Sequence, residues 1–284
     1  MPAAVTGSSA ITEVVHDGSR NTSLVRAVRE LVGERECVWA FAERYIRLRY
    51  KQAILGVGWA IIKPIALFVP FLIFFGGAAG ISGGGVSYAA FSIAVLGAWQ
   101  YVAASVDLGS GALIVDGQLL RKIYFAREAP VIGAAISNVP DLGIGILIAI
   151  AAAPFTGAHL TLNLLWIPLL AVLLTVPAFG MMLPFSALAV YYRDFKYGMP
   201  LVIQLWLFLS PVAYPITTLP KKYQYLMAAL NPVAGPLDGF RRTLAVGEGP
   251  NWTLVGLSAV SGTILLVSGF WLFKRLERAF ADVI

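Results

Sequence analysis

The feature that most constrains this chain is a set of long apolar stretches from which basic residues are absent. No Lys or Arg occurs between Pro64 and Leu120, or between Glu128 and Tyr192. A helix that crosses a bilayer needs about 20 mostly apolar residues. The sequence therefore predicts an all-α integral membrane protein with six transmembrane helices. The expected spans are 58–80, 88–108, 130–154, 162–190, 198–214 and 252–273.

The composition excludes several other classes of protein. Hydrophobic residues make up 58% of the chain and charged residues 13%, against roughly 45–50% and 25% in soluble domains. Too few charges remain to cover a soluble enzyme. The single Cys37 excludes an intrachain disulfide scaffold, and with only His16 and His159 no metal site is expected. The net charge is +6, but the basic residues flank the apolar stretches, as they do in membrane proteins, and are not gathered on one solvated face. No nucleic-acid partner is therefore expected.

The distribution of basic residues predicts the orientation of the chain. Six spans place both termini on one side of the membrane. Sixteen Lys and Arg residues fall in segments on that side, and four fall in segments on the other. Because positive charge is retained on the cytoplasmic side, both termini are predicted to be cytoplasmic.

The segment before the first span is predicted to be an amphipathic interface helix, residues 34–55, preceded by a polar tail, 1–33. Its apolar stripe has helical spacing and consists of Val38, Phe41, Ala42, Tyr45 and Leu48. Such a helix can lie in the inner headgroup layer. It is either a simple anchor, or its basic face also meets a phosphorylated lipid or a partner subunit. The basic residues of that surface are Arg44, Arg47, Arg49 and Lys51.

The region between the fifth and sixth spans is expected to form an external hairpin, residues 216–246. Prolines at 211, 215, 220, 232 and 236 interrupt this part of the chain, and two helical pieces are plausible, 222–230 and 236–246. Both are too short to cross a bilayer. Backbone that is not helical is tolerated at membrane depth only where protein or water surrounds it. The hairpin is therefore either a pore mouth or lid, or a pair of helices that plugs the fold.

Two polar features interrupt the apolar pattern. The loop from Asp116 to Glu128 combines apolar residues at helical spacing with basic residues. It either docks into a groove on another protein or packs against its own inner helices. Asp141 lies within the third span and is either a proton relay or, with Asn138, a cap where Pro140 restarts the helix.

The chain carries no recognisable catalytic motif. It has no P-loop, no H-E-x-x-H and no G-x-S-x-G, so transport is favoured over enzymatic activity. Aromatic rings in the second and fifth spans are either membrane-belt and core residues or lining for a passage in which sugar faces stack. The candidates are Trp99, Tyr101, Trp206, Phe208 and Tyr214.

Five motifs occur in a characteristic order along the chain. They are RYKQAILG at 49–56 with Trp59 and Pro64, YFARE at 124–128, YRDF at 192–195, LSPVAYP at 209–215, and Asn231-Pro232 followed by Arg241. Together they resemble the permeases of polysaccharide-export ABC transporters over about residues 38–275. Ala53 and Ala126 depart from the family pattern, which commonly has Ser or Thr and Pro there.

The resemblance implies a half-transporter in a bacterial inner membrane, with residues 56–284 as the six-helix domain. A second copy and two cytoplasmic ATP-binding subunits would be its partners. ATP and Mg would lie on those subunits, and no cofactor on this chain. The cargo would be a polysaccharide on a polyprenyl pyrophosphate, such as O-antigen, teichoic acid or galactan. The first and fifth spans would line a channel where the two copies meet, and membrane lipids would surround them.

The resemblance also implies roles for individual residues. The interface helix could help to admit the lipid pyrophosphate. Contacts with the ATPase would come from Leu120, Arg121, Lys122, Tyr124, Phe125, Arg127 and Glu128. An external gate would contain Pro215, Lys221, Lys222, Asn231, Pro232 and Arg241. Two alternatives remain open: an exporter of a lipid or drug with the same architecture, and a proton-coupled secondary transporter that uses Asp141.

Overall fold

The computed structural model describes residues 33–51, 58–117, 119, 125–278 and 280, and every element in these ranges is helical. The all-α class is therefore confirmed for this part of the chain. The elements are α2 (Arg35–Tyr50), α3 (Gly58–Phe71), η1 (Leu72–Ala78), α4 (Tyr88–Val115), α6 (Ala129–Ser137), α7 (Val139–Thr156), η2 (Leu162–Trp166), α8 (Ile167–Tyr191), α9 (Asp194–Leu209), η3 (Ile216–Thr218), α10 (Lys221–Leu230), α11 (Ala234–Arg241), η4 (Arg242–Val246) and α12 (Trp252–Glu277).

Five helical segments are long and apolar enough to cross a bilayer, which identifies a multi-pass membrane protein. They are Gly58–Ala78, Tyr88–Val115, Ala129–Thr156, Leu162–Tyr191 and Trp252–Glu277. The expected fifth span corresponds to α9, which has only 16 residues. A helix of that length rises about 24 Å, less than the ~30 Å hydrocarbon core. The total of six spans therefore remains a prediction.

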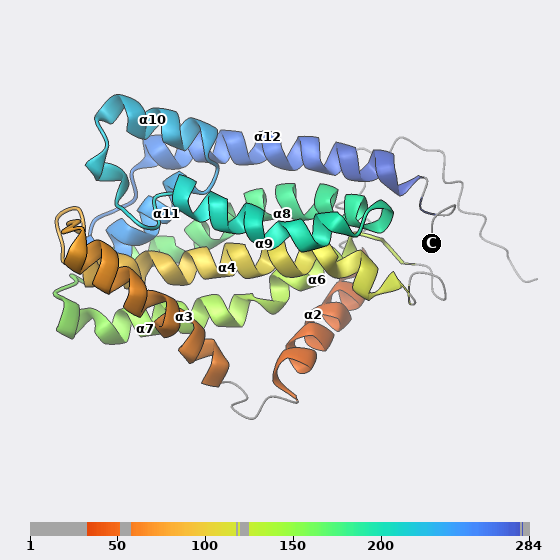
Figure 1. Cartoon of the computed structure of the whole chain (residues 1–284), viewed down its shortest axis with the longest axis horizontal. Helices are drawn as coiled ribbons and strands as arrows, with labels where there is room; N and C mark the ends of the chain where they lie inside the picture. The colour runs from red at the N-terminus through yellow and green to blue at the C-terminus, as the bar shows by residue number, and fades with distance from the viewer. Residues whose placement is uncertain (1–32, 52–57, 118, 120–124, 279, 281–284) are drawn as a thin grey trace, which may run out of the picture.

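The long helices run along the longest axis of the molecule, with α4 in the middle (Figure 1). The short helices α10 and α11 lie at one end, here called the hairpin end, and α2 lies toward the other, here called the α2 end. Small residues allow the long helices to approach closely. A Cβ added to Gly97 of α4 would lie 3.2 Å from the Cα of Gly145 on α7. Such contacts replace the hydrophobic driving force that lipid surroundings remove.

The amphipathic helix α2 forms as expected, but its apolar stripe does not face lipid. Val38, Phe41, Ala42 and Tyr45 are buried. They pack against α6, where a Cβ on Gly133 would lie 2.7 Å from the Cβ of Phe41. The prediction that the stripe lies in the headgroup layer is therefore wrong for these four residues. An amphipathic pattern demands an apolar partner, but it does not distinguish a lipid from another helix.

The expected third span is divided in two. Helix α6 ends at Ser137 and α7 begins at Val139, with Pro140 in its first turn. The predicted break is therefore present, but the predicted cap by Asn138 is not. Asn138 makes no capping hydrogen bond, and its Nδ2 instead donates to the carbonyl of Ala134 at 2.8 Å. The amide oxygen of Asn138 remains available to another partner.

The region between α9 and α12 contains two short helices, as expected. Helix α10 begins one residue before the expected start, and α11 begins at Ala234 and continues into the wider turns of η4. Every residue of α11 is buried, and this helix contacts α4, α8 and α12. The second half of the hairpin is therefore part of the core, as in the alternative in which the helices plug the fold.

Candidate functional site

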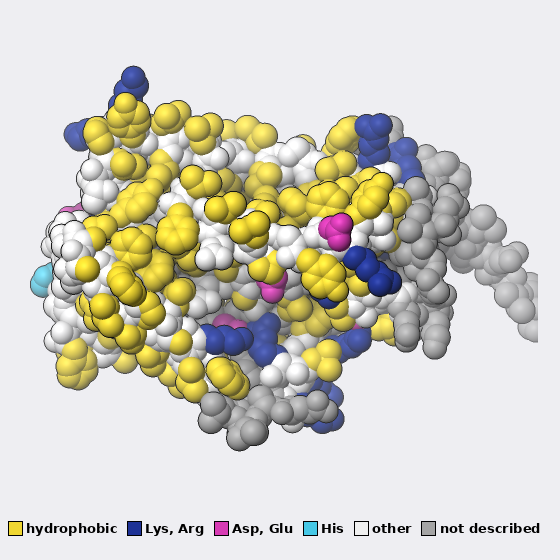
Figure 2. Space-filling view, in the orientation of Figure 1, with side chains coloured by type: hydrophobic (Ala, Val, Ile, Leu, Met, Phe, Trp, Pro, Cys, Tyr) yellow, Lys and Arg dark blue, Asp and Glu magenta, His cyan; other side chains and the backbone are white. Residues whose placement is uncertain are grey.

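A cavity of about 640 Å³ lies among α3, α4, α7 and α9, beside the end of α2. Polar side chains line it although the helices around it are largely apolar. Figure 2 shows basic and acidic side chains gathered between the part of the surface formed by α2 and that formed by α3. The polar lining consists of Arg49, Lys63, Gln100, Asp107, Asn138, Asp141 and Gln204. Charged groups at this depth are costly, so they usually face a protein-lined or water-filled space.

Arg49 joins the end of α2 to the break between α6 and α7. Its Nη1 donates to Oδ2 of Asp141 at 2.6 Å, and its Nη2 donates to Oδ1 of Asn138 at 2.7 Å. The Arg49 side chain is 19% exposed and that of Asp141 is 25% exposed. The intramembrane carboxylate is therefore ion-paired, which explains why Arg49 interrupts the apolar edge of α2.

A second polar contact fixes α2 nearer its middle. The guanidinium of Arg44 and the hydroxyl of Tyr45 both donate to the carboxylate of Asp116, which is buried at the end of α4. Burial, together with the hydrogen bond to this carboxylate, raises the pKa of Tyr45. The four basic residues predicted as one surface thus have different positions. Arg44 and Arg49 turn inward to carboxylates, whereas Arg47 bonds Glu43 at 2.5 Å and Lys51 is exposed.

The predicted ATPase-contact segment is only partly described. Leu120, Arg121, Lys122 and Tyr124 lie outside the described residues. Phe125 packs against Phe41 of α2, with ring centroids 5.2 Å apart.

The last two residues of the segment, Arg127 and Glu128, contact the last turns of α12. Nη1 of Arg127 donates to the carbonyl of Glu277 at 2.8 Å. Glu128 is buried and pairs with Nζ of Lys274 at 2.5 Å. The prediction that Glu128 belongs to an open docking surface is therefore wrong. The reason is that an acid at the start of a span is paired by a base from a distant span, which local sequence does not reveal.

The five aromatic candidates divide into core and cavity residues. Trp99 and Tyr101 are each 2% exposed, and the Tyr101 hydroxyl lies 3.0 Å from Oγ1 of Thr175. They belong to the core, so the prediction that they line a passage is wrong for this structure. Phe208 is 52% exposed and lines the polar cavity. Trp206 and Tyr214 line a separate apolar cavity of about 500 Å³ at the hairpin end.

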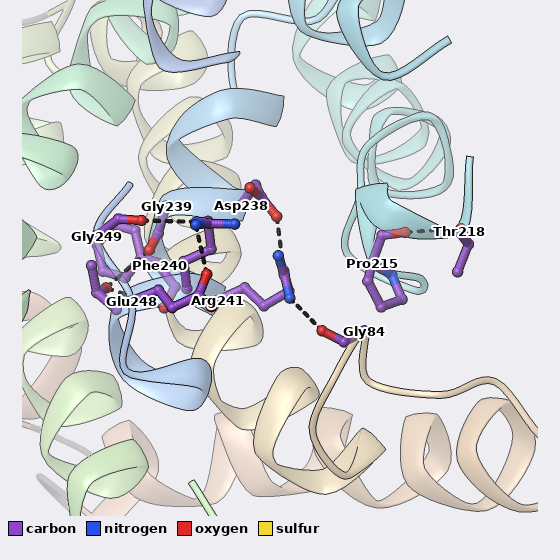
Figure 3. Close-up of polar contacts among 11 residues, drawn as sticks. Gly84, Pro215, Thr218, Asp238, Gly239, Phe240, Arg241, Glu248 and Gly249 are labelled. Atoms are coloured by element: carbon purple, nitrogen blue, oxygen red, sulfur yellow. Dashed lines mark hydrogen bonds and ion pairs between the residues drawn. The ribbon is translucent and has the colours of Figure 1, made fainter. Parts of the chain in front are cut away.

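Arg241 lies in a buried polar cluster at the hairpin end (Figure 3). Its Nε donates to Oδ1 of Asp238 at 2.8 Å, and its Nη1 donates to the carbonyl of Gly84 at 2.8 Å. Gly84 has a positive φ of 68°, and a Cβ there would lie 2.5 Å from Oγ1 of Thr217. Arg241 thus joins the turn before α4 to α11. Its charge is neutralised inside the protein by Asp238, one helical turn earlier. The assignment of Arg241 to an external gate stays a prediction.

The other residues predicted for the gate are placed in two groups. Pro215, Asn231 and Pro232 are buried, whereas Lys221 and Lys222 are exposed on α10. The Asn231 side chain connects the hairpin to α9. Its Oδ1 accepts from Nε1 of Trp206 at 3.1 Å, and its Nδ2 donates to Oγ of Ser210 at 2.8 Å. These contacts organise the hairpin as a packed unit.

Three residues that are important in the structure had no assigned role in the sequence prediction. Gln100 and Gln204 carry polar amide side chains within apolar helices. This exception to the apolar pattern is the signal that could have identified them as cavity residues. Asp116 was recognised only as the start of a loop, although its carboxylate holds α2.

Within the described ranges, no three His, Cys, Asp or Glu side chains lie together as metal ligands would.

Comparison with known proteins yields one family and several relatives. The family model described as "ABC-2 type transporter" matches residues 36–245. The chain is 26% identical over 244 residues to an O-antigen export system permease protein RfbA of Klebsiella pneumoniae, covering 84% of this chain and 91% of the relative. It is 22% identical over 263 residues to the protein of the same name in Myxococcus xanthus, covering 92% of this chain and 100% of the relative.

Proposed function

Because the chain belongs to the ABC-2 type transporter family, we propose that it is the membrane-spanning subunit of an ATP-driven exporter of lipid-linked polysaccharide. The relatives that this chain matches along nearly their whole length are named as O-antigen export permeases, and this observation carries the proposal. The five ordered motifs of the sequence support it. The family indicates a transport subunit and not an enzyme, and ATP hydrolysis is assigned to a separate chain that binds ATP and Mg.

The polar cavity supports a transporter that works as a pair. Its wall is formed by helices whose flanking faces are strongly apolar and exposed. On α3 these include Ile62 and Ile65, and on α9 they include Leu205 and Phe208. A second copy would cover these faces and close the cavity into a channel between the two chains. We therefore propose a homodimer with two ATP-binding subunits, in the bacterial inner membrane, with both termini in the cytoplasm.

The charges of the cavity supply a reason for a phosphorylated lipid carrier. Arg49 and Lys63 line the part of the cavity at the α2 end, which the positive-inside distribution places at the cytoplasmic face. The outward-facing Arg47 and Lys51 add a basic surface on α2. A pyrophosphate would be held there, while the polymer passes between α3 and α9. The hairpin end would form the external gate, with Lys221 and Lys222 on its outer surface.

Two experiments test the assignment. A tagged chain is purified without a tag on any partner, and the co-purified protein and bound glycolipid are identified by mass spectrometry. We expect an ATP-binding subunit and a polyprenyl-linked glycan. In a depletion strain, the lipid-linked polymer should accumulate inside the cell. Accumulation of a phospholipid or a drug instead, with normal polymer export, would favour the alternative cargo and contradict the proposal.

The ATPase-contact segment has its own test. Charge reversal at Arg121, written Arg121→Glu, should uncouple ATP turnover from export while membrane insertion stays normal. Arg278→Glu, at the end of α12, serves as a control for the reversal of one basic charge near the membrane. Export at the wild-type rate in Arg121→Glu, with ATP turnover still stimulated by cargo, would contradict the proposed docking role.

A further inference from the structure

Arg49 is the most connected basic residue of the polar cavity. It comes from the last turn of α2, and both terminal nitrogens of its guanidinium reach the α6–α7 break, 89 and 92 positions along the chain. One nitrogen bonds the charged Asp141 and the other bonds the neutral Asn138. The same cavity is lined by Lys63. The cavity thus holds two bases and two carboxylates of the protein, Asp107 and Asp141, and Asp141 is the one bonded to Arg49.

Carboxylate and phosphate are interchangeable partners for a guanidinium. Both present two oxygens that match the fork of N–H donors, and both form charge-assisted hydrogen bonds. Arg49 and Asp141 are each largely buried, so separating them without replacement would leave unpaired charges in a poorly solvated place. Arg49 is therefore expected to leave Asp141 only when another anion takes its place.

The rest of α2 does not depend on this pair. Arg44 and Tyr45 are held by Asp116 through separate contacts, and the apolar stripe is packed against α6. A phosphate that takes both terminal nitrogens of the Arg49 fork would displace Asp141 and Asn138 together. The last turn of α2 would then be released while the rest of the helix stays in place.

We propose that Asp141 is an internal counter-anion that holds Arg49 until a lipid phosphate displaces it, releasing the end of α2. This inference rests on the proposed function, since it assigns the regulation of the site where the carrier phosphate would bind. The phosphate has two possible sources, the polyprenyl diphosphate carrier and an anionic phospholipid of the bilayer. Their headgroup chemistry is shared, so the experiment must separate them.

Binding is measured on the full-length chain in phosphatidylcholine nanodiscs. One arm adds undecaprenyl diphosphate and the other adds phosphatidylglycerol. Asp141→Asn removes the competing charge and keeps the shape, so it should tighten binding by roughly tenfold. Arg49→Gln should weaken binding by roughly tenfold. In the double variant Arg49→Gln/Asp141→Asn, the gain from Asp141→Asn should disappear, because the two residues act through one contact.

A matched control removes a carboxylate from a different Arg pair. Glu248 pairs with Arg242 at 2.6 Å at the hairpin end, and Glu248→Gln should leave binding within about twofold of wild type. A second measurement needs no substitution. Hydrogen exchange of wild-type α2 should accelerate in its last turn when the phosphate lipid binds, while the amides near Tyr45 keep their protection.

The outcomes separate the two proposals. If wild type binds undecaprenyl diphosphate but Asp141→Asn binds no more tightly and the last turn of α2 stays protected, the counter-anion role is overturned and the proposed function stands. If phosphatidylglycerol alone is bound and shows the full pattern, the counter-anion role is supported and the proposed carrier is contradicted. If neither lipid binds to wild type or to Asp141→Asn, both proposals are overturned.

Discussion

The two ends of the molecule use charged residues in different ways. At the α2 end, the pairs Arg44–Asp116 and Arg49–Asp141 join segments that lie far apart in the chain, and the basic partner keeps some exposure. At the hairpin end, Arg241 and Asp238 are three residues apart on one helix, and each is 3% exposed. A partly exposed, long-range pair can exchange partners. A fully buried local pair has none to exchange with, so it fixes structure.

The same contrast applies to the backbone. At the hairpin end the third partner of the cluster is the Gly84 carbonyl, in a turn that a Cβ would disrupt. At the α2 end the third partner is the side-chain amide of Asn138. This residue lies at the break between α6 and α7, and its backbone keeps a helical conformation. The hairpin end is therefore expected to lose stability on substitution, and the α2 end is expected to change its binding and local motion.

The largest effect should come from Arg241→Ala. It leaves the Asp238 carboxylate buried without its base and removes the donor to Gly84, so the free energy of unfolding should fall by about 3–5 kcal/mol. Thermal unfolding of the purified chain in nanodiscs measures this. Arg242→Ala, next along the chain, loses a more exposed pair with Glu248 and one hydrogen bond to the Gly249 carbonyl, and should cost about 1–2 kcal/mol. Equal losses in the two variants would remove the distinction between the ends.

A smaller effect is expected in the turn that Arg241 holds. Gly84→Ala introduces both a left-handed backbone penalty and a clash with Thr217. Gly80 has a similar φ of 61° but nothing within 4 Å of an added Cβ, so Gly80→Ala carries the backbone penalty alone. Gly84→Ala should therefore be less stable than Gly80→Ala by about 1–3 kcal/mol in the same unfolding assay. Indistinguishable variants would show that the turn adjusts freely.

At the α2 end, Tyr45→Phe should cost about 1–2 kcal/mol, because one hydrogen bond to a buried carboxylate is lost. The pKa of Tyr45 is raised in the fold, so its contribution is complete below the pKa of an unfolded tyrosine, about 10. The contribution is lost as pH rises through the folded value. Wild type should therefore lose stability above about pH 10 relative to Tyr45→Phe. Parallel pH curves for the two proteins would argue against the contact.

The smallest effect belongs to the outer face of α2. Glu43 and Arg47 form an i,i+4 pair with both side chains substantially exposed. Glu43→Gln should change the free energy of unfolding by no more than about 0.5 kcal/mol, and less at high salt. A loss comparable with that of Tyr45→Phe would show that the outward face is covered by another part of the assembly.

The sequence determined the class of the protein, the positions of five apolar spans and the break in the third one. Transfer into a bilayer depends on the composition of each segment by itself, and Asn138 and Pro140 mark the break locally. The same local signals placed α10 and α11 within two residues of their observed starts.

Only the tertiary structure decided which partner each polar or aromatic side chain meets. Arg49 was assigned to a lipid surface but contacts Asp141, and Glu128 was assigned to a partner protein but contacts Lys274. Trp99 was placed on a passage but lies in the core. A base, an acid or a ring has the same local pattern whether its partner is lipid, another chain or a distant helix. The choice depends on which helices pack together, and that is a property of the whole chain.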